Sequence, residues 1–227
     1  MNEQPTSTWT VLDEAHRALR AAIAGIQNPD WLRPTPCTEW NVAQVLQHAA
    51  GDQLGYAAAV TGTGWPTFDP FAPTGHLPSD ATSDATSDAS AEAASEPGAD
   101  SADFAALALF AEETMRASAA TYSAIPQDAP EVATPLPQGK LPAWLAAGAC
   151  ALDAAVHAWD IARATNQPSP LDNSLSRDLL KVAQELTEPL RAWGAYAAIV
   201  PATPSDDDTA TLLRYLGRDP HWTAPTA

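Results

Sequence analysis

Basic side chains are scarce in this sequence. It has 11 Lys and Arg residues against 28 Asp and Glu residues, which gives a formal net charge of -17 at pH 7. Binding to nucleic acid depends on clustered Lys and Arg that neutralise phosphates, and binding to anionic membrane surfaces needs the same charges. The composition therefore argues against a nucleic-acid partner and against a membrane partner.

Cysteines and long apolar runs are also few. Cys37 and Cys150 are the two cysteines, and their separation matches neither a zinc finger nor a redox pair. We expect both to be small buried hydrophobic residues rather than metal ligands. No uninterrupted apolar run approaches the ~20 residues that span a bilayer. The N-terminal segment is polar and does not resemble a signal peptide, so we expect a cytoplasmic protein.

Alanine, in contrast, is abundant, and hydrophobic residues make up 45% of the 227 residues. Alanine is the strongest helix former and lets helix backbones approach closely. Apolar residues recur at intervals of three and four, which is typical of amphipathic helices. We therefore predict an all-α protein, a four-helix bundle with additional short helices.

The helices are expected at residues 8–26, from near 38 to 61, 101–124, 142–165 and 174–188 or beyond, with a further short helix near the C-terminus. Thr38 or Asn41 is expected to cap the second helix. Pro189 is expected to end or kink the fifth helix. The segment 126–142 reads as a loop with a short extended piece.

A single domain, residues 1–227, is expected to contain one low-complexity segment. Residues 79–100 repeat Ser, Asp, Ala and Thr and have no large apolar side chain. Burial therefore cannot offset the entropy lost on ordering them. We predict a mobile loop there, and a C-terminal extension that begins at about residue 198.

The predicted helix at 142–165 carries ionisable residues in an otherwise apolar sequence. Asp153, His157 and Asp160 fall on one narrow stripe at 100° per residue. A buried carboxylate is costly unless it is paired or bound to a metal. Asp153 and His157 are four residues apart and can chelate one ion. His48 lies beside the apolar stripe of the second helix and can supply a third ligand if the two helices face each other.

Two imidazoles and one carboxylate with an open coordination position suit Zn²⁺, and also Ni²⁺ or Fe²⁺. The open position favours catalysis, because structural zinc sites are usually closed. The alternative needs no metal: Asp153 and His157 could satisfy each other by hydrogen bonding, as buried polar groups commonly do. The spacing by itself leaves both interpretations open.

Two segments, RPTPCTEWNVAQVLQHAAGD and LDAAVHAWDIARATNQP, resemble the signature segments of a DinB-like metal-binding family. That family includes the N-terminal domain of mycothiol-dependent maleylpyruvate isomerase. The ending LLRYLGRDPHW resembles a stand-alone branch known only for metal binding. The resemblance implies a DinB-like four-helix bundle in which His48, Asp153 and His157 hold the metal. The isomerase has Glu where this chain has Asp153.

The resemblance also implies a metal-dependent transferase or isomerase that acts on a small-molecule substrate with a low-molecular-weight thiol such as mycothiol. Two other classes stay open: a hydrolase that uses metal-bound water, and a metal-binding module without catalysis. No catalytic residue is assigned. Asp160 is a candidate for orienting His157, and Asp52 and Tyr56 are candidate bases beside His48. Related bundles often pair, so a homodimer is also open.

Overall fold

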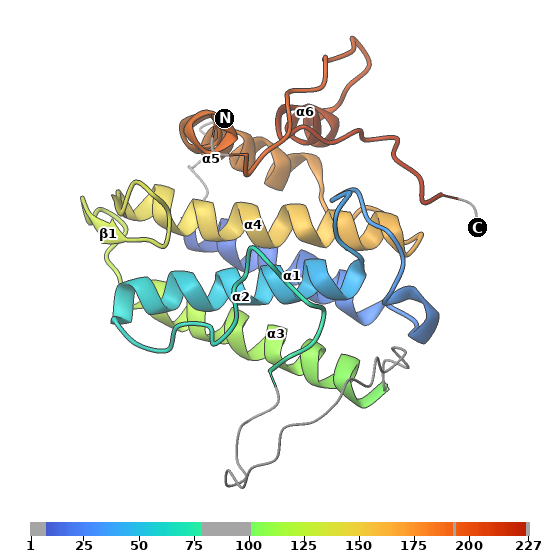
Figure 1. Cartoon of the computed structure of the whole chain (residues 1–227). Coiled ribbons are helices and arrows are strands. Elements are labelled where there is room, and N and C mark those ends of the chain that lie inside the picture. Colours follow the sequence, from blue (N-terminus) through green and yellow to red (C-terminus); the bar gives the residue numbers. More distant parts are fainter. Residues whose placement is uncertain (1–7, 79–100, 193, 226–227) are drawn as a thin grey trace, which may run out of the picture.

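The computed structural model describes residues 8–78, 101–192 and 194–225, and most of them are helical (Figure 1). The α-helices are α1 (Thr8–Ala24), α2 (Val42–Thr61), α3 (Ser101–Ser123), α4 (Ala143–Ala164), α5 (Asn173–Ala192) and α6 (Asp208–Tyr215). A 3-10 helix (Asn28–Asp30) and two short strands, β1 (Val132–Ala133) and β2 (Lys140–Leu141), complete the described elements. The predicted loop at 79–100 lies outside the described residues.

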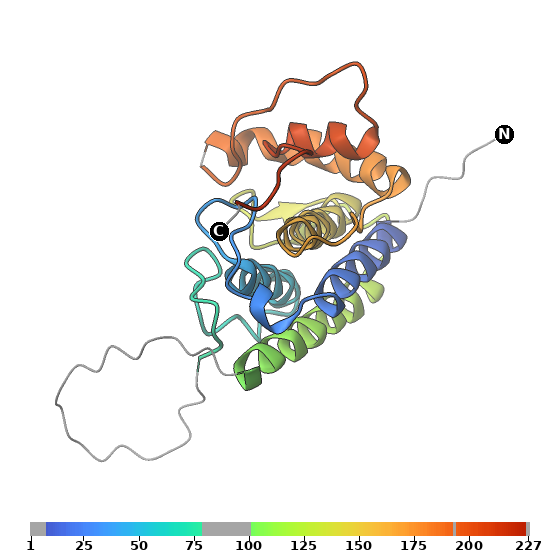
Figure 2. The same cartoon turned by 90° about the vertical axis from the view of Figure 1, so that its right-hand side faces the viewer.

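Helices α1 to α4 form a closed four-helix bundle. α1 packs on α4, α4 on α2, α2 on α3, and α3 on α1. Figure 2 shows α2 and α4 nearly end-on and α1 and α3 obliquely, with α5 and α6 on the outer side of α4. The core between them is rich in alanine and leucine. The predicted all-α bundle with additional helices is therefore confirmed.

α4 is the central helix, because it contacts α1 and α2 within the bundle and α5 on its outer side. By length and composition alone α4 could cross a membrane, but 94% of its most apolar window is buried inside the protein. Gly148 permits the close approach of α5. A Cβ atom at this position would lie 2.6 Å from Cγ2 of Val182, which is far inside normal contact distance.

α2 begins at Val42 rather than near residue 38, and its N-cap is Asn41, one of the two expected caps. The Asn41 side chain accepts a hydrogen bond from the Gln44 backbone at 2.9 Å, and the Gln44 side chain accepts one from the Asn41 backbone at 3.0 Å. This reciprocal capping box satisfies two backbone donors at the helix start. Residues 31–41 consequently form a separate loop that crosses the end of the bundle (Figure 1).

α5 continues past Pro189 to Ala192, so the expectation that Pro189 ends the helix is wrong, and the expected extension beyond residue 188 is confirmed. Proline lacks one N–H, and the carbonyl left without that donor belongs to Glu185. Glu185 and Pro189 are both exposed, so water can bond to this carbonyl. Leu190 is buried on the opposite face and holds the last turn against the protein. The expected extended piece in 126–142 is present as the antiparallel pair of β1 and β2.

The segment beyond residue 198 docks back onto the bundle. α6 packs on α5, and the chain then turns at Gly217, whose φ is +82°. A Cβ atom there would lie 2.8 Å from the carbonyl oxygen of Ala197, so glycine is required on steric grounds as well. The tail then reaches α4, where Arg163 donates hydrogen bonds of 3.2 and 2.6 Å to the carbonyl of Trp222.

Candidate metal centre

His48, Asp153 and His157 converge where α2 faces α4. Oδ1 of Asp153 lies 3.6 Å from Nε2 of His48 and 3.4 Å from Nε2 of His157. One nitrogen or oxygen from each residue lies within 4.8 Å of the others. The structure thus brings together the three residues that the sequence selected; that they bind a metal ion remains a prediction.

These separations suit ligands around a common ion. Zn–N and Zn–O bonds of about 2.0–2.1 Å in a tetrahedron separate neighbouring ligand atoms by about 3.3–3.4 Å. Direct hydrogen bonds between nitrogen and oxygen are shorter, usually about 2.7–3.2 Å. The two measured distances of 3.4 and 3.6 Å therefore agree better with a shared ion than with a strongly hydrogen-bonded triad.

Both imidazoles are oriented with Nδ1 away from the centre. Nδ1 of His48 is 2.8 Å from the carbonyl oxygen of Pro70, and Nδ1 of His157 is 3.0 Å from Oδ2 of Asp160. A carbonyl and a paired carboxylate can only accept, so each Nδ1 carries the hydrogen. In the neutral imidazoles, Nε2 then presents its lone pair toward Asp153, as metal binding requires.

Asp153 gives the clearest test of whether an ion fits. Its side chain is 12% exposed, and its Oδ2 atom is buried with no hydrogen-bond partner among the described residues. A buried unpaired carboxylate oxygen is costly. A cation held between the three side chains would compensate this charge, so the donor set and the unpaired oxygen both fit a divalent metal.

The electrostatics of the centre reflect its burial and crowding. Burial raises the pKa of Asp153, but the adjacent His157 and His48 side chains lower it more, and the net pKa lies well below its usual range. Burial, together with the charge of Asp153, raises the pKa of Asp52 to about 7 against the opposing effect of His48. The Asp52 carboxylate lies 3.9 Å from Nε2 of His48. Tyr56 is buried one turn further along α2, and burial raises its pKa well above 10.

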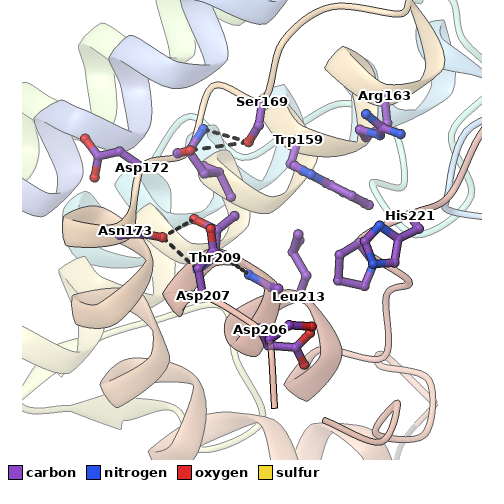
Figure 3. Close-up of a pocket in the computed structure, with 14 residues that line it drawn as sticks. Trp159, Arg163, Ser169, Asp172, Asn173, Asp206, Asp207, Thr209, Leu213 and His221 are labelled. Atoms are coloured by element: carbon purple, nitrogen blue, oxygen red, sulfur yellow. Dashed lines mark hydrogen bonds between the residues drawn. The ribbon is translucent and has the colours of Figure 1, made fainter. Parts of the chain in front are cut away.

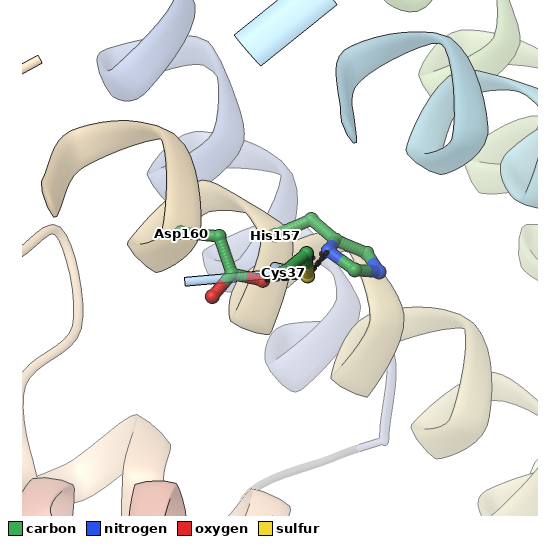
Figure 4. Close-up of side chains that lie close together, drawn as sticks. All are labelled: Cys37, His157 and Asp160. Atoms are coloured by element: carbon green, nitrogen blue, oxygen red, sulfur yellow. Dashed lines mark hydrogen bonds and ion pairs between the residues drawn. The ribbon is translucent and has the colours of Figure 1, made fainter. Parts of the chain in front are cut away.

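Asp160 occupies the supporting position expected for it, and two residues that the sequence did not select contact it. Arg218 donates from Nε to Oδ1 at 2.9 Å and from Nη2 to Oδ2 at 2.8 Å. Cys37 donates from Sγ to Oδ2 at 3.2 Å and lies 4.0 Å from Nδ1 of His157 (Figure 4). Neither residue was identified from the sequence, because no local spacing connects residues 37, 160 and 218.

Cys37 is half-buried and packs against the hydrophobic core, and its thiol also lies in a polar cluster beside Asp160. Cys37, His157 and Asp160 also form a geometrically admissible metal triad. Asp160 already accepts hydrogen bonds from both Arg218 and His157, so this triad is less suited to a cation than the first. Cys150 is fully buried as expected, and it donates to Oε1 of Gln53 at 3.0 Å.

Aromatic rings line one side of the candidate centre. The rings of Trp40 and His48 have centroids 4.7 Å apart, and the Phe71 ring lies 6.0 Å from His48. Phe71 is 72% exposed, which is unusual for a phenylalanine beside a buried polar site. The loops before and after α2 thus supply an apolar rim next to His48.

A separate cavity of about 520 Å³ lies between the end of α4, the start of α5, α6 and the C-terminal tail (Figure 3). None of the predicted site residues lines it. Three of its lining acids already have structural partners. Asp172 accepts from the Leu175 backbone and Asp207 caps α6, while Asp206 binds Thr203 and Arg214.

The fold and its central residues define a class of protein: a helical bundle with a candidate metal site between two of its helices. The sequence model of the mycothiol maleylpyruvate isomerase N-terminal domain matches residues 12–162, which is more than half of the chain. This protein therefore belongs to that family, and the resemblance seen in the two signature segments is confirmed.

Two relatives from Mycobacterium tuberculosis match almost the whole chain. They are the uncharacterized proteins Rv0738 of strain H37Rv and MT0763 of strain CDC 1551, each 28% identical to this chain over 208 residues. Each alignment covers 90% of this chain and 93% of the relative. No solved structure matches the chain at a significant level.

Proposed function

We propose that this protein holds one divalent metal ion, most suitably Zn²⁺, through His48, Asp153 and His157, with Ni²⁺ or Fe²⁺ as alternatives. We further propose that it is a transferase or isomerase that acts with a low-molecular-weight thiol such as mycothiol. The main support for a bound metal ion is the environment of the Asp153 carboxylate. Its Oδ1 faces two imidazole Nε2 atoms, and its buried Oδ2 has no hydrogen-bond partner in the described chain. The family description, which names mycothiol, supports the thiol.

When bound, a divalent ion at this position lowers the pKa of a thiol so that it ionises at neutral pH. Side chains around the candidate centre orient the two imidazoles, offer apolar surface to a substrate and provide a proton acceptor. Hydrogen bonds from the Nδ1 atoms to Pro70 and Asp160 fix both imidazoles. The Trp40 and Phe71 rings offer apolar surface to an incoming substrate. The Asp52 carboxylate, 3.9 Å from His48, is within reach to accept a proton released there.

Elemental analysis of protein purified in metal-free buffer and then loaded with one equivalent of Zn²⁺ tests the metal. We expect one bound ion in the wild type and loss of that ion in both His48→Ala and His157→Ala. His221→Ala is the matched control, because His221 is an exposed histidine in the tail. Circular dichroism should show an intact helical fold in all four proteins. Equal zinc content in the wild type and both ligand variants would remove the proposed centre.

The activity is tested with zinc-loaded protein, a low-molecular-weight thiol and a panel of electrophilic substrates, including cis-unsaturated diacids. We expect thiol-dependent conjugation or isomerisation that disappears in His157→Ala and persists in His221→Ala. If zinc is bound but no thiol-dependent product forms with any substrate of the panel, the thiol part of the proposal is wrong.

A metal-dependent hydrolase is the second candidate function, and the position of Asp52 supports it as much as it supports the first. A carboxylate beside the centre can accept a proton from water as well as from a thiol. Turnover of esters or amides without added thiol would select this function over the first.

A further inference from the structure

We propose that Arg218 is a positioning residue of the metal centre. It acts through Asp160 to hold the His157 imidazole in the tautomer and orientation that metal binding needs. This inference rests on the metal centre proposed above, and it assigns a role to a residue outside the segment matched by the family, residues 12–162.

The contacts form a short chain from the tail to the candidate ligand. The guanidinium of Arg218 donates hydrogen bonds to both oxygens of Asp160, from Nε to Oδ1 at 2.9 Å and from Nη2 to Oδ2 at 2.8 Å. Oδ2 then accepts from Nδ1 of His157 at 3.0 Å. Nε2 on the far side of the same imidazole faces Asp153 at 3.4 Å. Arg218 therefore lies two hydrogen bonds from a candidate metal ligand.

The two-point contact has a geometric consequence. A carboxylate with one partner can rotate about its terminal torsion, which is broad for Asp. A planar guanidinium that binds both oxygens fixes the carboxylate plane. With Asp160 fixed in this way, Oδ2 stays where it accepts from His157, and Nδ1 keeps the hydrogen. Without Arg218, Asp160 keeps partners only on Oδ2, from His157 and Cys37, so the carboxylate can turn about this atom and the imidazole can change tautomer or rotate.

Burial strengthens the requirement for a cation at this position. The Asp160 side chain is 0% exposed and that of Arg218 is 12% exposed. An isolated buried carboxylate is strongly unfavourable, whereas a paired and hydrogen-bonded one is tolerated. Nη2 of Arg218 is also 3.4 Å from Sγ of Cys37, so the guanidinium connects the loop before α2 with α4.

The backbone of the tail directs Arg218 to this position. α6 ends next to Gly217, whose left-handed conformation and close contact with Ala197 turn the chain. The following residue then points at α4. The C-terminal segment is consequently part of the centre, although no spacing in the sequence relates it to His157.

If Arg218 only attached the C-terminal tail to α4, its loss should affect zinc binding no more than the loss of another residue that attaches the same tail. Arg163 on α4 fastens the same tail through the carbonyl of Trp222, and it has no contact with Asp160 among its hydrogen bonds and ion pairs in the described structure. Arg163→Met is therefore a matched control. It loosens the tail and leaves the contact between Arg218 and Asp160 in place.

The experiment measures the zinc dissociation constant of the full chain by competition with a chromogenic chelator. Replacing a partner that supports a metal-ligating histidine typically weakens metal binding by about 10- to 100-fold, and we expect this loss for Arg218→Met. Arg218→Lys should bind zinc more tightly than Arg218→Met but less tightly than the wild type, because lysine restores the charge but not the bidentate hydrogen bonds to Asp160. Arg163→Met should bind zinc as the wild type does, and His157→Ala should lose the site.

A second readout uses the metal-free protein. Nitrogen-15 NMR of the histidine rings, recorded at an alkaline pH at which the His157 imidazole is neutral, should report His157 with hydrogen on Nδ1 in the wild type and in Arg163→Met. In Arg218→Met it should report a mixture of tautomers. A residue that only fastens the tail would leave this signal unchanged.

The outcomes separate this inference from the proposed function. Wild-type zinc affinity in Arg218→Met, or equal losses in Arg218→Met and Arg163→Met, would overturn the positioning role while the metal centre stands. Absence of zinc binding in the wild type would overturn both. If Arg218→Met does not fold, Asp160→Leu/Arg218→Met removes both charges and leaves no unpaired ion. The same 10- to 100-fold weakening is expected there, and unchanged affinity contradicts the proposal.

Discussion

Replacing Gly148 with alanine should destabilise the protein, although the same change normally stabilises a helix. Gly148 lies inside α4, where alanine is preferred over glycine by about 0.5–1 kcal/mol. The added Cβ atom, however, would lie 2.6 Å from Cγ2 and 3.3 Å from Cγ1 of Val182 on α5. Carbon atoms in contact are normally about 3.5–4.0 Å apart, so α4 and α5 must move apart or Val182 must change its rotamer.

The expected magnitude follows from these two opposing effects. Overpacking of a buried contact typically costs about 1–3 kcal/mol, against the gain of about 0.5–1 kcal/mol in helix propensity. The net loss in the free energy of unfolding should be about 0–2.5 kcal/mol. Gly55 in α2 is the matched control, because a Cβ atom there would meet nothing closer than Pro135 at 3.8 Å. Gly55→Ala should therefore keep the propensity gain.

Urea unfolding of both variants measures the difference, which should be about 1–3 kcal/mol in favour of Gly55→Ala. The variants Val182→Ala and Gly148→Ala/Val182→Ala complete a double-mutant cycle, because the change at Val182 removes the two methyl groups that the new Cβ meets. We expect a favourable coupling energy of at least about 0.5 kcal/mol. If Gly148→Ala stabilises the protein as much as Gly55→Ala does, the close packing of α5 on α4 is refuted.

Two further predictions concern the metal and a buried histidine. Zinc at about 100 times its dissociation constant should stabilise the protein by about 2.7 kcal/mol, which raises Tm by about 5–11 °C in a chain of this size; calorimetry should show the shift in the wild type and not in His48→Ala. His16 is buried and bonds Gln53 at 2.7 Å, and burial lowers its pKa from 6.5. Unfolding therefore takes up a proton below pH 6.5, so the free energy of unfolding falls as pH drops from 6.5 toward the folded pKa. His16→Gln should lose less stability than the wild type between pH 7.5 and 5 in urea titrations, and an equal or larger loss would contradict the reasoning.

Helix positions were largely predictable because they depend on local periodicity. The apolar repeats gave α1, α3 and α4 to within one or two residues at each end. The errors arose where a specific contact overrides the pattern. The start of α2 is set by the Asn41 and Gln44 capping box. The continuation of α5 past Pro189 depends on Leu190 packing against the protein while the affected carbonyl stays exposed.

What the sequence by itself determined is the local chemistry of α4. A helix repeat of 3.6 residues puts Asp153 and His157 on one face, and the burial of His157 follows from the apolar residues around it. The sequence left open whether His48 meets them, because this requires that α2 faces α4, which the tertiary structure shows. Tertiary structure alone decided that Arg218 and Cys37 reach Asp160. Contacts between residues so distant in sequence depend on how loops and tail cross the bundle, and no periodic pattern encodes those paths.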